Sequence, residues 1–319
     1  MSKREYTKGL HDLGNGVYAY LLPDGSWGLN NAGLVVDGEE SLLVDTLFDL
    51  ASTREMLDEM KGATEAAATI DTLVITHANG DHFYGNELVK GAAIIATKAC
   101  AQEMAEASPQ MLAELAKAAP NMGELGEFFI KCFSQFKFDD INPLPPTRTF
   151  EKRLDLKVGS KEVQLIEVGP THTMGDCILY LPGERVVFAG DILFIGGTPI
   201  MWVGPVANWI NACDLMLEMD VETIVPGHGP ITDKGGVEAV KEYWEYLLEE
   251  TRKRYDAGMS ADETVDDIDL GKYASLGEAE RIVVNVNTLY KEFSGDTTPA
   301  NVIELFGSMA KVGMKLHGN

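Results

Sequence analysis

Two imidazoles and a carboxylate lie close together in the chain, directly behind an apolar run. Residues 76–82 read THANGDH and follow residues 70–75, which read IDTLVI. An apolar run of this length bounded by turn residues is typical of a buried strand, so His77, Asp81 and His82 would lie in the turn at its end. Imidazole nitrogen and carboxylate oxygen are the ligands that divalent zinc prefers. The pattern indicates a metal site.

Three more polar residues follow apolar runs, each in a turn flanked by Gly or Pro: His172 in GPTHT, Asp191 in FAGD and His228 in PGHG. A single histidine in such a place is more often structural, but four of the six histidines in the chain share this setting. The two aspartates also have a simpler interpretation, since Asp81 and Asp191 would each suit the cap of a short helix or turn. The repetition favours a shared metal centre built on the ends of several strands.

The order and spacing of these residues resemble the metallo-β-lactamase superfamily, whose hallmark is HxHxDH followed by a later His, a later Asp and a final His. This chain has His77-x-Asn79-x-Asp81-His82, and the other three positions are His172, Asp191 and His228. The resemblance covers roughly residues 15–232. It implies a mixed α/β fold, the αββα sandwich, in which two β-sheets face each other with helices outside.

The resemblance also implies roles, carried over position by position. His77 and His172 would bind a first metal ion, and Asp191 would bridge it to a second ion. The second ion would be held by Asp81, His82 and His228. Asp45, in the run LLVDT, matches a recurrent aspartate that lies beside the site.

Asn79 departs from the family pattern, which has a second histidine at this position. An amide oxygen is a poorer zinc ligand than imidazole, so the first site would be weaker, or selective for a harder ion such as manganese or iron. Two interpretations stay open. The centre binds one metal ion, or it binds two with Asn79 as a weak ligand or a water anchor. We expect zinc, one or two per chain.

The function that the resemblance implies is a metal-dependent hydrolase in which metal-bound hydroxide attacks a carbonyl or a similar electrophile. Asp81 and Asp191 are the candidate catalytic residues, and Asp81 would orient the nucleophile or accept its proton. Aromatic residues are frequent around the motifs, and the nearest cations are Lys98 and Arg185, so no clamp for an anionic group is predicted. The expected substrate is an ester, lactone, thioester or amide of a mainly apolar small molecule. The alternatives are an iron-dependent redox member of the same fold and a non-catalytic metal-binding relative.

Composition excludes several partners. The 319 residues carry a formal net charge of −24, which would repel nucleic acids and anionic membranes. No apolar stretch reaches the length of a membrane span, and residues 1–14 show no secretory signal, so we expect a cytoplasmic protein. The four cysteines are widely spaced, which favours free thiols over a disulfide framework.

Hydrophobic periodicity predicts the elements that must position these residues. Strands are expected at 16–22, 31–37, 41–45, 70–76, 155–158, 163–168, 177–181, 185–189 and 222–225. The predicted catalytic domain covers residues 1–235, with a helical insertion at about 98–140, and a C-terminal helical extension covers residues 236–319. Thr298-Pro299 predicts a helix start, and the apolar stripe behind it at 302–312 is the candidate interface of a homodimer.

Overall fold

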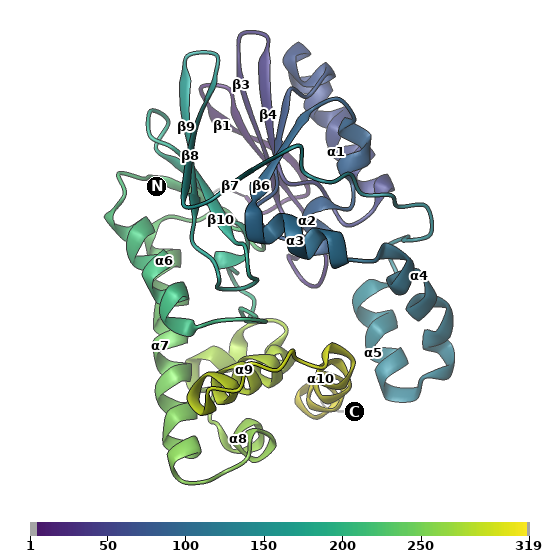
Figure 1. Cartoon of the computed structure of the whole chain (residues 1–319), viewed down its shortest axis with the longest axis vertical. Helices are drawn as coiled ribbons and strands as arrows, with labels where there is room; N and C mark the ends of the chain where they lie inside the picture. Colours follow the sequence, from purple (N-terminus) through teal and green to yellow (C-terminus); the bar gives the residue numbers. More distant parts are fainter. Residues whose placement is uncertain (1–4, 318–319) are drawn as a thin grey trace.

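The computed structural model describes residues 5–317, and within this range the strands form two sheets (Figure 1). The seven-stranded sheet has the order β1-β2-β3-β4-β5-β6-β7, and the five-stranded sheet has the order β12-β11-β10-β9-β8. The first comprises β1 (Gly9–Gly14), β2 (Val17–Leu21), β3 (Ala32–Asp37), β4 (Glu40–Val44), β5 (Thr72–Val74), β6 (Ala93–Thr97) and β7 (Arg148–Phe150). The second comprises β8 (Arg153–Val158), β9 (Lys161–Glu167), β10 (Cys177–Leu181), β11 (Val186–Phe188) and β12 (Thr223–Val225).

The two sheets pack face to face over one apolar core. Alternate residues of β2, β3 and β4 point inward, where they meet alternate residues of β9, β10 and β11. The sheets approach closely at Gly33, where a Cβ atom would lie 2.2 Å from the ring of Phe188. A glycine is required at this point because Phe188 fills the space that a side chain would occupy.

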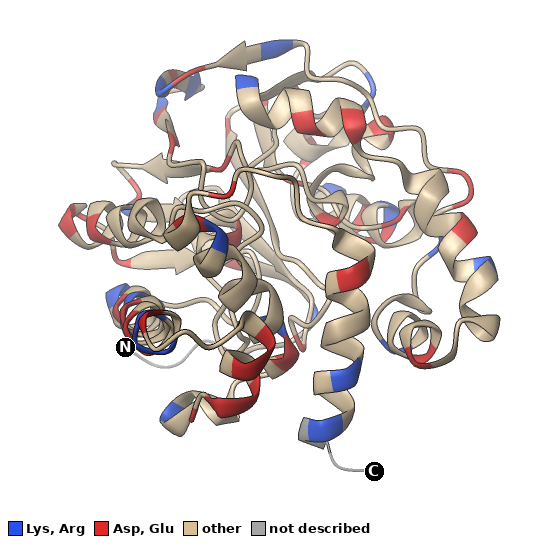
Figure 2. Ribbon diagram, turned by 60° about the horizontal axis from the view of Figure 1, so that its bottom comes forward, with Lys and Arg blue, Asp and Glu red and all other residues tan. Residues whose placement is uncertain are grey.

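Helices cover the outer faces of both sheets and one end of the sandwich (Figure 1). The outward residues of the strands, such as Leu43 and Val187, form a second apolar core with these helices. The helices are α1 (Leu50–Ala63), α2 (Gly80–Phe83), α3 (Lys98–Glu106), α4 (Pro109–Ala118), α5 (Gly123–Phe133), α6 (Val206–Glu218), α7 (Lys234–Asp256), α8 (Ala261–Asp267), α9 (Ile282–Ser294) and α10 (Val302–His317). This arrangement confirms the predicted αββα sandwich. Acidic residues are spread over these helices (Figure 2), as the net charge requires.

Some elements differ from the expectation. Strands β1, β6 and β7 were not predicted, because β1 and β7 carry charged and polar residues and β6 is a five-residue run beside a helix start. The last helix begins at Val302 rather than at Pro299, since the side chain of Asn301 accepts the amide hydrogen of Glu304 at 3.3 Å. Its apolar stripe packs within the chain: Leu305 and Met309 are buried.

The helical insertion between β6 and β7 contains α3, α4 and α5, and α5 lies beside α10 (Figure 1). The ring of Phe306 on α10 lies among four aromatic rings from three segments, with centroid distances of 5.5 to 6.2 Å. These rings belong to Trp27, Phe128, Phe133 and Trp202. None of the helices within residues 5–317 has the length and apolar character needed to span a bilayer.

Candidate metal centre

The loop after β5 carries the first group of candidate ligands. The carbonyl of Asn79 accepts the amide hydrogen of His82 at 2.9 Å, which begins the single-turn helix α2. The φ of Gly80 is not in the left-handed region, so its conformation does not require a glycine. The reason for glycine is space, since a Cβ at Gly80 would lie 2.6 Å from the ring of Tyr84. The close packing of Tyr84 holds α2 against the strand ends.

The carboxylate of Asp191 lies among the four predicted imidazoles. Its Oδ1 is 3.1 Å from Nε2 of His82, and its Oδ2 is 3.4 Å from Nε2 of His172. Oδ2 also lies 3.4 Å from Nε2 of His228 and 3.7 Å from Nε2 of His77. A carboxylate in this position can bridge two cations. The placement argues against a capping role for Asp191, which belongs to the 3₁₀ turn Gly190–Ile192.

The candidate ligands form two groups that could each hold an ion. In each group the ligand atoms lie within 4.8 Å of one another, and every residue is buried. We call His77, His172 and Asp191 the first group, and Asp81, His82 and His228 the second group. These are the two sets that the superfamily pattern implied. All of the predicted positions except Asn79 fall in one of the two groups.

Asp81 lies inside the first turn of α2 and is not its N-cap. Its Oδ2 is 3.4 Å from Nε2 of His228 and 3.9 Å from Nε2 of His82. Asp81 is 8% exposed, more than the other members of the two groups.

Asn79 lies against the first group. Its Nδ2 is 2.8 Å from Nε2 of His172, the nitrogen that faces Asp191. Because an amide can rotate to exchange its oxygen and nitrogen, the same side chain can present its oxygen at this place. Asn79 is thus near enough to act as a weak ligand or to hold a water molecule.

The far nitrogen of each imidazole is occupied by a hydrogen-bond partner. Nδ1 of His82 contacts Oδ2 of Asp45 at 2.8 Å, and Nδ1 of His77 contacts Oγ1 of Thr76 at 3.0 Å. Two backbone carbonyls serve the others: Nδ1 of His172 lies 2.6 Å from Ile200 O, and Nδ1 of His228 lies 3.1 Å from Gly25 O. With Nδ1 engaged in this way, Nε2 of every ring is directed into the centre.

Asp45 was expected beside the site, and its contacts explain why. Its carboxylate accepts the backbone N–H and the hydroxyl of Thr76, both at 2.7 Å, in addition to its contact with His82. Its backbone has a φ of +60°, a left-handed conformation that a residue other than glycine adopts only when the surroundings impose it. Asp45 connects the ends of β4 and β5 to a metal-binding imidazole.

Burial and the clustered charges shift the pKa values of the ligands. Burial, reinforced by the neighbouring His82, holds the pKa of His77 well below its ordinary value. Burial also opposes the charge of His228, but Asp191 and Asp81 outweigh it and raise the pKa of His228 to about 9. The nearby carboxylates likewise raise the pKa of His82 well above normal, and the histidines lower that of Asp191. The carboxylates of the site thus favour positive charge at the two histidines of the second group.

The donor set fits a divalent metal ion. Within residues 5–317, Nε2 of His77, Nε2 of His82 and Oδ1 of Asp191 are fully buried and have no aligned hydrogen-bond partner. Unsatisfied buried polar atoms are costly, and three of them among the candidate ligands of the two groups indicate that a bound ion completes the site. The imidazole and carboxylate atoms are those that zinc takes.

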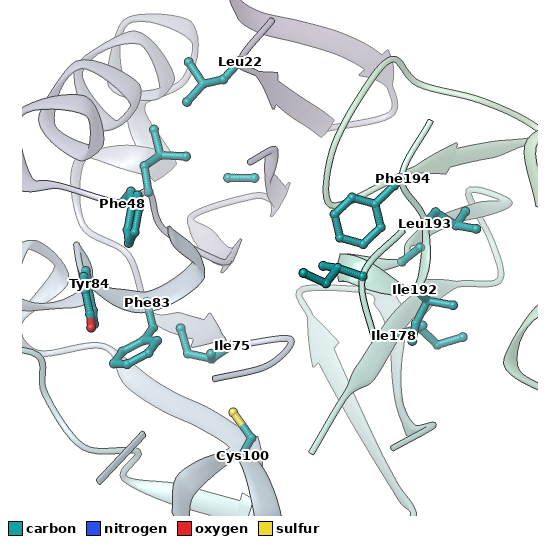
Figure 3. Packing of buried hydrophobic residues seen from close by; sticks show 14 of the residues in the cluster. Leu22, Phe48, Ile75, Phe83, Tyr84, Cys100, Ile178, Ile192, Leu193 and Phe194 are labelled. Atoms are coloured by element: carbon teal, nitrogen blue, oxygen red, sulfur yellow. The ribbon is translucent and has the colours of Figure 1, made fainter. Parts of the chain in front are cut away.

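Sequence reasoning missed the buried cation nearest the centre. Arg281 is 1% exposed, and its guanidinium lies 4.4 Å from the ring of Trp27 and 5.1 Å from the ring of Phe194. The Phe194 ring in turn stacks on His228 with centroids 5.0 Å apart. Figure 3 shows Phe194 in the apolar core, across from Phe48 and Phe83. No local signal marks Arg281, because it follows the last histidine of the motif by some fifty residues.

Fold, ligand order and ligand geometry agree with the result of a family comparison. The chain belongs to the metallo-beta-lactamase superfamily, whose family model matches residues 25–228. Among curated proteins, it is 32% identical over 129 residues to the 2,4-dinitroanisole O-demethylase subunit alpha of Nocardioides sp. (strain JS1661), which covers 39% of this chain and 38% of that protein. It is 25% identical over 211 residues to a metallo-beta-lactamase type 2 of Bacillus sp. (strain 170), which covers 64% of this chain and 68% of that protein.

Solved structures show the same fold. The sec-alkylsulfatase Pisa1 from Pseudomonas sp. aligns with a TM-score of 0.67 at 16% identity, over 92% of this chain. The chain spans about half of that protein, 52% of its length. A metallo-beta-lactamase from Pontibacter korlensis aligns with a TM-score of 0.54 at 18% identity, over 75% of this chain and 99% of that one. The alkylsulfatase match extends further, so it includes part of residues 236–319.

Proposed function

We propose that this protein is a metal-dependent hydrolase that cleaves an ester, lactone, thioester or amide bond in a mainly apolar small molecule. Zinc is the proposed cofactor, with one or two ions per chain. The observation that carries the proposal is the carboxylate of Asp191, which has the Nε2 atoms of four histidines within 3.7 Å. Membership of a superfamily that includes beta-lactamases supports hydrolysis.

When bound, a divalent ion lowers the pKa of water to about 7 and polarises the group under attack. The chain's own residues would supply the rest. His77, His172 and Asp191 would hold a first ion, with Asn79 beside it, while Asp81, His82 and His228 would hold a second. Neighbouring His82 and His228 outweigh the effect of burial and lower the pKa of Asp81, so this carboxylate is ionised near neutral pH and able to accept a proton.

The surroundings of the ligands support an apolar substrate. The Phe194 ring covers His228, and the rings of Tyr84 and Phe48 stack 5.8 Å apart beside Gly80. Arg281, the buried cation nearby, donates to the carbonyl of Thr198 at 2.9 Å and is enclosed by aromatic rings. Because these contacts engage Arg281 in the fold, we do not assign it to binding an anionic group of the substrate. A neutral substrate is therefore favoured over a phosphate or a nucleic acid.

We propose a small-molecule substrate, with no nucleic-acid or membrane partner, in the cytoplasm. The similarity to an O-demethylase subunit adds aryl methyl ethers to the bonds worth testing. A homodimer remains a proposal. Its predicted interface would be limited to the exposed side of α10, where Val302 is 49% and Ile303 57% exposed.

A screen of purified, zinc-loaded protein against lactones, aryl esters, acyl thioesters, β-lactams, phosphodiesters, sulfate esters and aryl methyl ethers tests the proposal. Turnover of a carboxylic ester, thioester or amide that chelator abolishes and zinc restores is the expected result. The His82→Ala variant should be inactive. Metal analysis that finds no bound metal after zinc loading would contradict the proposal, as would activity that survives in the His82→Ala variant.

A further inference from the structure

On the side of the ring that faces away from the centre, His172 contacts a backbone carbonyl. Nδ1 of His172 donates to Ile200 O at 2.6 Å, and both residues are buried. Residue 200 lies in the irregular stretch 194–204, between the 3₁₀ turn Gly190–Ile192 and α6. No regular strand or helix holds this peptide group in place, so its direction must come from other contacts.

Asn285 on α9 binds the backbone on both sides of Ile200. Its Nδ2 donates to Pro199 O at 2.8 Å, and its Oδ1 accepts the amide hydrogen of Met201 at 2.8 Å. Nδ2 also donates to the hydroxyl of Tyr243 on α7 at 3.1 Å. Asn285 is fully buried, so its side-chain amide is confined to this one set of partners.

A second residue of α9 holds the same stretch. The hydroxyl of Thr288 donates to Met201 O at 2.7 Å. The next residue, Trp202, donates its backbone N–H to the carbonyl of His172 at 3.0 Å. The stretch 194–204 therefore contacts both the side chain and the backbone of His172. It also contacts helix α9 through Asn285 and Thr288.

We propose that Asn285 is a positioning residue for the metal ligand His172, acting through the carbonyl of Ile200. Helix α9, although it follows the last metal-binding motif, is then a part of the support of the first group. This inference concerns the metal site alone and holds whichever bond the protein cleaves. Hydrogen-bond partners of ligating histidines typically change metal affinity 10- to 100-fold when they are removed.

Asn86 provides a matched control. It is a fully buried asparagine whose side-chain amide also bonds backbone with both its oxygen and its nitrogen, donating to Leu144 O at 2.8 Å and accepting from Leu144 N at 2.7 Å. Leu144 lies in the connector before β7 and holds no candidate ligand. The substitutions Asn285→Leu and Asn86→Leu remove the same kind of contact, and only the first should reach the metal centre.

The experiment measures zinc binding and the exchange of imidazole N–H protons by nuclear magnetic resonance, with labelled histidine. In Asn285→Leu we expect the Nδ1–H of His172 to exchange faster and zinc affinity followed at His172 to fall by up to about tenfold, the lower end of the range for a direct partner, because Asn285 acts through Ile200 O. The Nδ1–H of His228, which is bonded to Gly25 O, should keep its exchange rate. Asn86→Leu should lower the melting temperature and leave both signals unchanged.

Two further variants decide the matter if Asn285→Leu does not fold. Asn285→Ala removes the amide without added bulk or charge and should shift His172 in the same direction, and Thr288→Val removes one hydroxyl without a change of shape and should give a smaller shift in that direction. Equal behaviour of His172 in these variants and in the wild type would overturn the inference. Because N–H exchange is measured in metal-free protein too, a wild type without hydrolytic activity would refute the proposed function while this inference stands.

Discussion

Asp191 belongs to the first group and contacts the histidines of both groups, but the two groups differ in the residues that support their ligands and in the charges around them. In the second group a carboxylate, Asp45, contacts the far nitrogen of His82. In the first group the corresponding partner of His172 is the neutral carbonyl of Ile200. Carboxylate partners make an imidazole a more basic ligand. The group with the more basic ligands should bind its ion more tightly.

The pKa shifts follow the same division. Burial and the adjacent His82 lower the pKa of His77 in the first group, whereas nearby carboxylates raise the pKa values of His82 and His228 in the second. The second group thus experiences the stronger negative potential and the greater attraction for a cation. Asn79, which replaces a histidine beside the first group, adds to the difference. We therefore expect the second group to fill first and the first group only at higher metal concentration.

The strongest test removes what the groups share. Asp191→Asn should abolish tight binding in both, because the amide cannot neutralise two cations and several kcal/mol of metal-assisted stabilisation are lost. We expect turnover to fall about a thousandfold or more, since each 1.4 kcal/mol corresponds to tenfold. Metal analysis and hydrolysis rates measure the effect. Asp71→Asn, which alters an aspartate that accepts Ser41 N at 2.9 Å, is the control, and retention of two ions by Asp191→Asn would break the comparison.

The second test uses pH on metal-free protein. His228 has an ordinary pKa of 6.5 that is raised to about 9 in the fold, so the protonated ring stabilises the native state. This contribution is complete below pH 6.5 and is lost as pH rises to about 9, at a cost on the order of 3 kcal/mol. Urea unfolding at several pH values measures it.

Zinc-loaded protein should show the opposite trend over the same range, because zinc displaces these protons and binds more tightly as pH rises. If the free energy of unfolding changed with pH in the same way for the metal-free and zinc-loaded forms, the second group would hold neither the proton nor the ion.

The third test separates the groups. Asp45→Asn should weaken zinc at the second group about 10- to 100-fold while the first group changes less, because only His82 loses its carboxylate partner. Zinc titrations followed at the individual histidines report each group separately. The control is Asp49→Asn: Asp49 is a buried aspartate that caps α1 by accepting Ser52 N at 2.8 Å. Asp49→Asn should lower the stability of the protein and leave zinc binding at both groups unchanged. A uniform loss over both groups would show that they do not bind independently.

The smallest expected effect comes from restoring the superfamily residue. Asn79→His should tighten the weaker zinc site about tenfold, a gain of about 1.4 kcal/mol, because imidazole is the better zinc ligand. Affinity for manganese should rise less. Unchanged zinc affinity would mean that Asn79 is not directed at the ion, despite its contact with His172.

The sequence predicted the candidate ligands, but it did not predict the hydrogen bonds that orient them. His77, Asp81 and His82 are close in the chain, so the motif alone identifies them as candidate ligands. The distant His172 and His228 were recognised by their turns behind apolar runs. The contacts that orient them were not foreseen: Ile200 and Gly25 contribute only backbone carbonyls, which carry no signal of residue type.

The fold shows the same limit. The resemblance to the superfamily implied the αββα class, and the principal strands follow from apolar runs, but β1 and β7 lie at sheet edges and are largely polar. The apolar stripe of α10 predicted a helix correctly and could not tell which surface it would cover.

By itself, the sequence determined which atoms are available as ligands and that they lie at strand ends, because residue type and hydrophobic periodicity are local properties. Only the tertiary structure decided that Asp191 lies among four imidazoles and that Asn285 forms hydrogen bonds to the backbone on both sides of Ile200, beside the candidate ligand His172. Such contacts join residues far apart in the chain, and they exist only once the packing of two sheets and the C-terminal helices has fixed where each peptide group points.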